Sequence, residues 1–394
     1  MRRIIGSAVS WLALLALPGA ASAQTPAPAP ALPDHPVTIS VVDVAGNLAL
    51  TQAAFEQFRR DHPKLVSRIV FSKAPAPELP GKLRAQQAAG RLDIDLVLTG
   101  TDALAAGMAQ NVWLQVLPQF ASSFPDLDAT LLPGADAMQK QYNGYGVIVS
   151  YSPGGPLLEY APDRVPDPPR SAEALAVYCH AHPGKFMYAR PANSGPGRAF
   201  LMGLPYILGD KDPKDPVNGW DKTWAYLKDL NTCIDYYPSG TTVTMKELGE
   251  GSRDVIATMT GWDINPRAIG IVPEDDKIAA LKDFRFVTDG HYMAVPRGIA
   301  PDKLAVVLEM MKALLTPQLQ AYTYDKGYFY PGPSVKDVPL SMAPPESQAV
   351  LKQYGRPEYD ALIAETPEVT PLDADTMVAA FRKWDEDIGA SKTR

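Results

Sequence analysis

The sequence has few histidines and cysteines, and it lacks the motifs on which most secreted hydrolases depend. Its 394 residues include five histidines and two cysteines, and no Gly-x-Ser-x-Gly, Ser-x-x-Lys or His-Glu-x-x-His motif occurs. Serine and zinc hydrolases use arrangements of this kind. Carboxylates are numerous, but no glycosidase pair stands out among them. We therefore expect no enzyme and no cofactor, and a secreted hydrolase remains the weakest alternative function.

Long apolar runs and an excess of positive charge are also missing. Beyond the N-terminus no segment has the ~18 apolar residues that a membrane span requires. The formal net charge is −7, and an acidic surface argues against binding to nucleic acid or to an anionic membrane. If the protein serves transport, the channel must therefore be another chain.

The N-terminus predicts export. Arg2 and Arg3 precede a short apolar stretch over 4–17, and Ala21-Ser22-Ala23 offers small residues to a signal peptidase. We predict a cleaved signal peptide over 1–23, a Pro/Ala-rich tether over 24–36 and a periplasmic location. An uncleaved membrane anchor is the alternative.

The two cysteines are Cys179 and Cys233. In an oxidising compartment an even number favours one disulfide, and the alternative is two separate buried thiols. Cys179-His180-Ala181-His182 resembles part of a metal site, but no second group of ligands has matching spacing. We therefore expect surface histidines beside a structural cysteine, and no metal site.

Apolar strands alternate with amphipathic helices along the chain, and this order is typical of an α/β protein with parallel sheets. Strands are expected at 37–44, 68–72, 94–98, 146–151, 185–190, 254–259, 284–287 and 291–295. Helices are expected at 48–60, 81–89, 101–109, 171–181, 197–208, 220–230, 302–315 and 317–325. We predict lobe I over 37–144 and 291–330, lobe II over 145–290, and a helical C-terminal region over 331–394.

Several segments, taken in order, resemble a known family. These are DIDLVLTGTDALAAGM at 93–108, KFMYARPANSGPGRAFL at 185–201 and LLTPQLQAYTYDKGYFYPG at 314–332. Together they are similar to the family 1 extracellular solute-binding proteins of ABC importers. Ser194-Gly195-Pro196-Gly197, Gly261-Trp262-Asp263 and the Tyr-rich tail resemble the YnjB-like branch.

The resemblance implies a two-lobed type II periplasmic-binding fold in which each lobe is a mainly parallel sheet flanked by helices. It also implies a monomer that captures a small molecule between the lobes and docks on an ABC transporter permease in the inner membrane. A secreted sensor or scaffold of the same fold is the alternative.

Ligand contacts are expected in loops at the carboxyl ends of strands, where α/β folds bind their ligands. Helix starts there offer free N–H groups, although Thr101 and Asp102 could equally cap their helix. Trp262 could stack on a planar or cationic group, or pack in the core. The full expected set is Gly46, Asn47, Thr99, Gly100, Thr101, Asp102, Tyr145, Ser194, Gly195, Gly197, Arg198, Trp262, Asp263, Asp289 and Tyr292.

These residue types suggest a ligand with two kinds of group. Ser194 to Arg198 is typical of an anion-binding helix start with a fixed positive charge. The alternative is an ordinary tight turn with a solvent-facing arginine. Trp262 and Asp263 suit a cation. We expect a small organic solute that is cationic or zwitterionic, such as thiamine or a phosphate ester of it. Polyamines and molecules like 2-aminoethylphosphonate remain open. Ferric ion is disfavoured because the only adjacent tyrosines, Tyr236 and Tyr237, would point in opposite directions on an extended segment.

Overall fold

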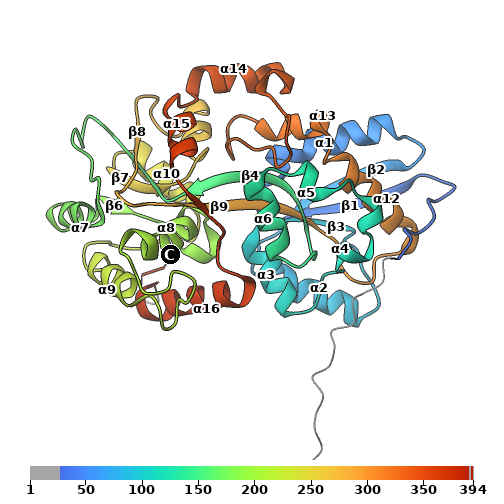
Figure 1. The fold of residues 1–394 in the computed structure, drawn as a ribbon, viewed down its shortest axis with the longest axis horizontal. Helices are drawn as coiled ribbons and strands as arrows, with labels where there is room; N and C mark the ends of the chain where they lie inside the picture. Colours follow the sequence, from blue (N-terminus) through green and yellow to red (C-terminus); the bar gives the residue numbers. More distant parts are fainter. Residues whose placement is uncertain (1–26, 390–391, 394) are drawn as a thin grey trace, which may run out of the picture.

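The computed structural model describes residues 27–389 and 392–393, which form two β-sheets flanked by helices (Figure 1). The larger sheet contains β1 (Val37–Asp43), β2 (Val66–Lys73), β3 (Leu96–Thr99), β4 (Val147–Gly155), β9 (Phe286–Ala294) and β10 (Glu368–Val369). The smaller sheet contains β5 (Leu157–Tyr160), β6 (Phe186–Met187), β7 (Val255–Thr258) and β8 (Lys277–Ala279). The prediction of an α/β fold with two sheets is confirmed.

Helices surround each sheet in separate groups (Figure 1). Beside the larger sheet lie α1 (Leu48–Asp61), α2 (Leu79–Ala88), α3 (Thr101–Ala109), α4 (Val116–Gln119), α5 (Leu127–Thr130), α6 (Pro133–Gln141), α12 (Pro301–Ala313) and α13 (Pro317–Gln320). Beside the smaller sheet lie α7 (Ala172–Ala181), α8 (Gly195–Ile207), α9 (Asp221–Leu230), α10 (Thr241–Gly249) and α11 (Ile264–Ala268). None of the helices within the described ranges is long and apolar enough to span a membrane.

The start of the larger sheet follows directly from its sequence. Strand β1 pairs in parallel with β2 and with β3, as expected for consecutive βαβ units. The helix between β1 and β2 buries Ala54, Phe55 and Phe58 in the core of the larger sheet. Parallel pairing brings the carboxyl ends of β1, β2 and β3 to one edge.

Two long strands run from one sheet toward the other. Strands β4 and β9 are antiparallel to each other, and every residue of both is buried (Figure 1). The sequence predicted two separate strands here, 284–287 and 291–295. That prediction was wrong, because β9 is one continuous strand. The residues at its centre, 288–291, are polar or small and therefore break the apolar pattern. Pairing of Asp289, Gly290 and His291 with β4 keeps the strand continuous.

The smaller sheet differs from the expected mainly parallel arrangement. Strand β6 pairs in parallel with β7, but β5 pairs antiparallel with both β7 and β8. The reason is that β5 begins two residues after β4 ends, so it enters the sheet in the direction set by the crossing strand. No helix precedes β5 to reverse the chain, which a parallel strand would require.

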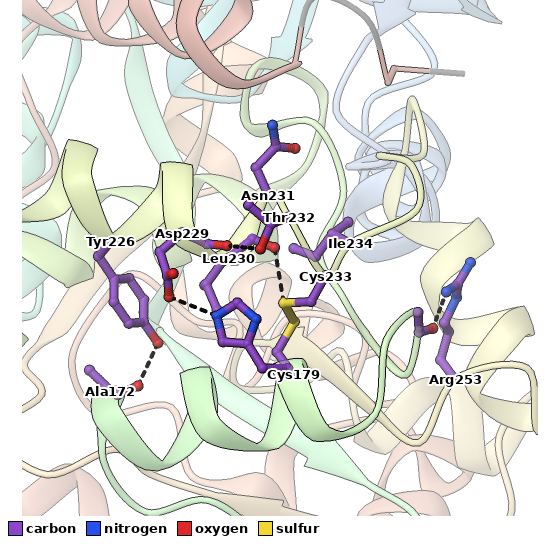
Figure 2. The surroundings of a disulfide bond; sticks show 12 residues. Ala172, Cys179, Tyr226, Asp229, Leu230, Asn231, Thr232, Cys233, Ile234 and Arg253 are labelled. Carbon is purple, nitrogen blue, oxygen red and sulfur yellow. Dashed lines mark hydrogen bonds and ion pairs between the residues drawn. A yellow bond between two sulfur atoms is a disulfide. The ribbon is translucent and has the colours of Figure 1, made fainter.

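The predicted disulfide between Cys179 and Cys233 is present. It joins the last turn of α7 to the segment after α9, with a Cα–Cα distance of 5.8 Å and a sequence separation of 54 residues (Figure 2). Nearby, the ring Nε2 of His180 lies 3.0 Å from the Asp229 carboxylate on the surface. The histidines beside the cysteine are therefore surface groups, as predicted.

The C-terminal region is helical with one short strand. It contains α14 (Pro345–Tyr354), α15 (Glu358–Glu365) and α16 (Ala374–Trp384), and β10 adds to the edge of β9. Helix α16 buries Met377, Phe381 and Trp384 in the core of the smaller sheet and also contacts α3 beside the larger one. The C-terminal helix thus touches the helices of both sheets.

The structure describes only part of the predicted N-terminal leader and tether. The predicted signal peptide and the first residues of the tether lie outside the described residues. Residues 27–36 form no helix or strand. The lobe boundaries at 144 and 290 remain predictions, although the largest core clusters gather around the two sheets separately.

Candidate functional site

A cavity of about 360 Å³ lies between elements of the two sheets. Its walls come from the loops after β1, β2 and β7, from the starts of α3, α8 and α10, and from the middle of β9. The loop after α13 completes the wall with Tyr328 and Phe329. The lining residues are Val44, Ala45, Gly46, Pro75, Ala76, Pro77, Gly100, Asp102, Asn193, Ser194, Gly195, Arg198, Gly240, Thr241, Thr242, Trp262, Asp289, His291, Tyr328 and Phe329.

The loop after β1 is held in place by one buried carboxylate. Asp43 Oδ1 accepts N–H groups from Ala45 at 2.9 Å and Asn47 at 3.0 Å, and its Oδ2 accepts that of Leu48 at 3.0 Å. Gly46 within the loop has a φ of +76°, which favours glycine. These bonds order the cavity wall and the beginning of α1.

His291 on β9 enters the cavity wall as a neutral ring. Burial lowers its pKa, and its Nδ1 lies 3.0 Å from Asn47 Nδ2. Thr51 Oγ1 donates to Asn47 Oδ1 at 2.7 Å, so the Asn47 amide presents its NH₂ group to the ring. The histidine ring also stacks on Phe329 with centroids 4.5 Å apart.

Arg198 is held between two carboxylates. Its Nη2 donates to Asp289 Oδ2 at 2.9 Å, and its Nη1 lies 3.7 Å from Asp102 Oδ2. The Arg198 and Asp289 side chains are both less than 10% exposed, at 9% and 8%. The three residues come from α8, β9 and α3, so this cluster connects the two sheets.

These contacts change the sequence interpretation of the α8 start. Ser194 Oγ accepts the Gly197 N–H at 3.0 Å, and Ser194 O accepts that of Arg198 at 2.8 Å. Pro196 has no N–H to offer. Because most N–H groups are satisfied and Arg198 is matched by carboxylates, the surroundings favour an anion less than expected.

Aromatic side chains form another part of the cavity wall. Trp262 and Tyr328 pack with ring centroids 4.8 Å apart, and Phe329 continues the same surface. Gly261 permits this arrangement, since its φ is +98° and a Cβ there would lie 2.4 Å from Tyr330 N. Such faces attract organic cations as well as planar groups.

Eight of the expected contact residues line the cavity: Gly46, Gly100, Asp102, Ser194, Gly195, Arg198, Trp262 and Asp289. Two others lie directly behind the wall. Asn47 positions His291, and Gly197 donates its N–H to the Ser194 hydroxyl that caps α8. Thr99 and Thr101 are buried at the end of β3 and the start of α3.

The remaining three expected residues lie elsewhere. Asp263 is fully buried behind Trp262, where it accepts hydrogen bonds from Arg356 Nε at 2.6 Å and from Tyr359. Tyr292 packs edge-on against Tyr142, and burial raises its pKa. Tyr145 lines a different cavity, beside α6.

Sequence reasoning missed several lining residues. Pro75 to Pro77 follow β2 and could have been found by the same strand-end rule that identified Gly46. Gly240 to Thr242 begin α10, a helix that was not predicted. His291 lies within β9 and Tyr328 in the loop after α13, so the strand-end rule does not single them out. The described part of the chain contains no group of three or more His, Cys, Asp or Glu suited to a metal ion.

A family model described as bacterial extracellular solute-binding protein matches residues 53–352. No curated protein matches the chain significantly in sequence.

Solved structures with the same fold are distant in sequence. A periplasmic thiamin binding protein is 17% identical with a TM-score of 0.60, covering 91% of this chain and 99% of that one. The apo ferric ion-binding protein A of Pasteurella haemolytica is 14% identical with a TM-score of 0.62, covering 89% and 97%. AfuA of Actinobacillus pleuropneumoniae, solved with fructose-6-phosphate, is 14% identical with a TM-score of 0.60, covering 89% and 98%. At these identities the likeness shows the fold alone.

Proposed function

Because the chain belongs to the bacterial extracellular solute-binding proteins, we propose that it is the periplasmic substrate-binding component of an ABC importer and that its ligand is a small organic cation or zwitterion. The ligand would bind in the cavity between the two sheets and be passed to a permease in the inner membrane. Placement in the YnjB-like branch remains a prediction from sequence.

The charge of the cavity lining carries the proposal about the ligand. Asp102 and Asp289 contribute two carboxylates, whereas Arg198 contributes one guanidinium. His291 adds no charge because burial lowers its pKa. One negative charge therefore remains unmatched in a buried space, where a positive ligand group would be stabilised more than in water.

The aromatic wall supports the same ligand class. Trp262, Tyr328 and Phe329 line the cavity on one side, and a cation over such rings gains about 0.5–2 kcal/mol. A ligand acceptor group could also meet the ring N–H of His291 or the backbone N–H of Gly195. A molecule with one positive and one acceptor group would use both halves of the lining.

Closure follows from the placement of these groups. The cavity is lined by elements of both sheets, so a ligand makes all of its contacts only when the two parts approach each other. Binding then shifts the population toward the closed arrangement. A sensor of the same fold would close in the same way, and the partner protein distinguishes the two roles.

The binding test is a titration of the intrinsic tryptophan fluorescence, to which Trp262 in the cavity wall contributes, with thiamine, spermidine, 2-aminoethylphosphonate and citrate. We expect cations or zwitterions to bind and citrate not to bind. Asp289→Asn keeps the acceptor for the Gly290 N–H but removes a charge, so it should weaken cation binding at least tenfold, equivalent to about 1.4 kcal/mol.

Asp93→Asn is the matched control, because the Asp93 side chain is 63% exposed and does not line the cavity. It should leave binding unchanged. Citrate binding in the micromolar range, with no response to any of the three nitrogen compounds, would overturn the assignment of a cationic ligand.

A further inference from the structure

A second cavity adjoins the first one on the side of α3. It has a volume of about 430 Å³ and lies between α3 and α16. Figure 1 shows α16 reaching toward α3 from the helices of the smaller sheet, and the two helices are in contact. We call this space the side cavity, and the first one the ligand cavity.

The side cavity and the ligand cavity are immediate neighbours. Four residues line both of them, namely Ala76, Pro77, Asp102 and Asn193. Asp102 therefore lies at the junction, with its carboxylate 3.7 Å from Arg198 on the ligand-cavity side. A molecule anchored at Asp102 would reach the side cavity without crossing any further element of the fold.

The two cavities differ in chemical character. The ligand cavity holds the charged cluster of Asp102, Asp289 and Arg198, whereas the walls of the side cavity are mainly apolar. Those walls are Ala103, Ala105 and Ala106 from α3 with Met377, Val378 and Phe381 from α16.

Apart from Asp102 at the junction, the charged groups of the side cavity lie around Arg190 and the C-terminal end of α16. There Arg190 Nε donates to Asp385 Oδ1 at 2.8 Å, and its Nη2 donates to the other oxygen of the same carboxylate. Because the Arg190 and Asp385 side chains form an ion pair with each other, neither needs a charged group of the ligand as a partner. Arg382 and Glu386 are exposed at the rim and are free to stay in water.

We propose that the ligand is an amphipathic organic cation, with its charged group in the ligand cavity and an apolar substituent that passes Asp102 into the side cavity. The inference rests on the proposed function, because it needs a cation beside Asp102 and Asp289. It goes further in assigning a second subsite and the kind of substituent that fills it. Apolar groups moved from water into such a space bind more tightly in proportion to the area buried.

The test compares two probes that share one charged group. Tetramethylammonium and hexyltrimethylammonium differ only by methylene groups, and each buried methylene should strengthen binding roughly fourfold. Burying two of them in the side cavity predicts a more than tenfold preference for the hexyl compound. Isothermal titration calorimetry of the full mature chain measures both affinities.

Variants then locate the effect. Ala106→Phe fills the side cavity from α3, and Val378→Phe fills it from α16. Ala109→Phe is the matched control, since Ala109 lies on the same helix but is exposed and lines neither cavity. We expect both filling variants to reduce the preference below threefold while tetramethylammonium affinity is unchanged, and Ala109→Phe to keep the preference. Far-UV circular dichroism checks that each variant is folded.

The outcomes separate this inference from the proposed function. Equal affinity of the two probes for the wild-type chain, or a preference that survives both filling variants, would overturn the second subsite and leave a cation receptor standing. Binding of neither probe, together with failure of every cation in the fluorescence panel, would overturn the cation receptor and the subsite together.

Discussion

The disulfide between Cys179 and Cys233 closes a long loop, and its removal should have a measurable cost. The bonded residues are 54 positions apart, and both cysteines are buried. In the chain-entropy model a loop of that length removes about 14 cal/mol/K from the unfolded chain, or about 4 kcal/mol at 25 °C. We expect reduction to lower the free energy of unfolding of the wild-type chain by about that amount.

Urea unfolding followed by tryptophan fluorescence measures this effect, because Trp220 and Trp224 are buried in the same core cluster as both cysteines. The double variant Cys179→Ala/Cys233→Ala should resemble the reduced wild type and should not respond to reductant. Thiol labelling verifies that reduction is complete. A fully reduced wild type that unfolds at the same urea concentration as the oxidised form would refute the reasoning.

Three further changes test other parts of the account by urea unfolding. Burial raises the pKa of Asp276 to about 7. The stability that its protonated carboxyl contributes is therefore present below pH 4 and is lost as the pH rises through 7. Asp276→Asn should remove that part of the pH dependence of the unfolding free energy, and an unchanged profile would contradict the assignment. Asp263→Ala should cost about 3–5 kcal/mol, because it leaves Arg356 without its partner in a buried site. Gly261→Ala should destabilise the loop at Tyr330, where a Cβ would lie 2.4 Å from the backbone nitrogen, and a stable variant with unchanged ligand affinity would show that this approach is not required.

The regular parts of the fold could be predicted because local pattern and tertiary environment agree there. Helix α3 begins and ends where its pattern of small and apolar residues predicts, at Thr101 and Ala109. Strand β9 could not be predicted as one element, since its central residues are polar and only pairing with β4 makes them a strand. The two-residue strand β10 depends on a partner 82 positions away at Phe286, which no local window contains.

The site was predictable where it follows a strand end and not where it depends on packing between distant segments. Gly46, Gly100 and Ser194 each follow or begin an element whose type was correctly inferred. The neutralisation of Arg198 could not be inferred, because Asp289 is 91 positions away and reaches it from a strand that had been read as two. Charge at a site depends on such pairings, which is why the sequence suggested a more anion-friendly cavity than the structure contains.

The most direct test of the central claim is native mass spectrometry of the mature protein purified from its own organism, followed by identification of any small molecule released on denaturation. We predict one bound molecule per chain that carries a positively charged nitrogen and is absent from the Asp289→Asn variant prepared in the same way. A released molecule with acidic groups alone, retained by that variant, would contradict the account.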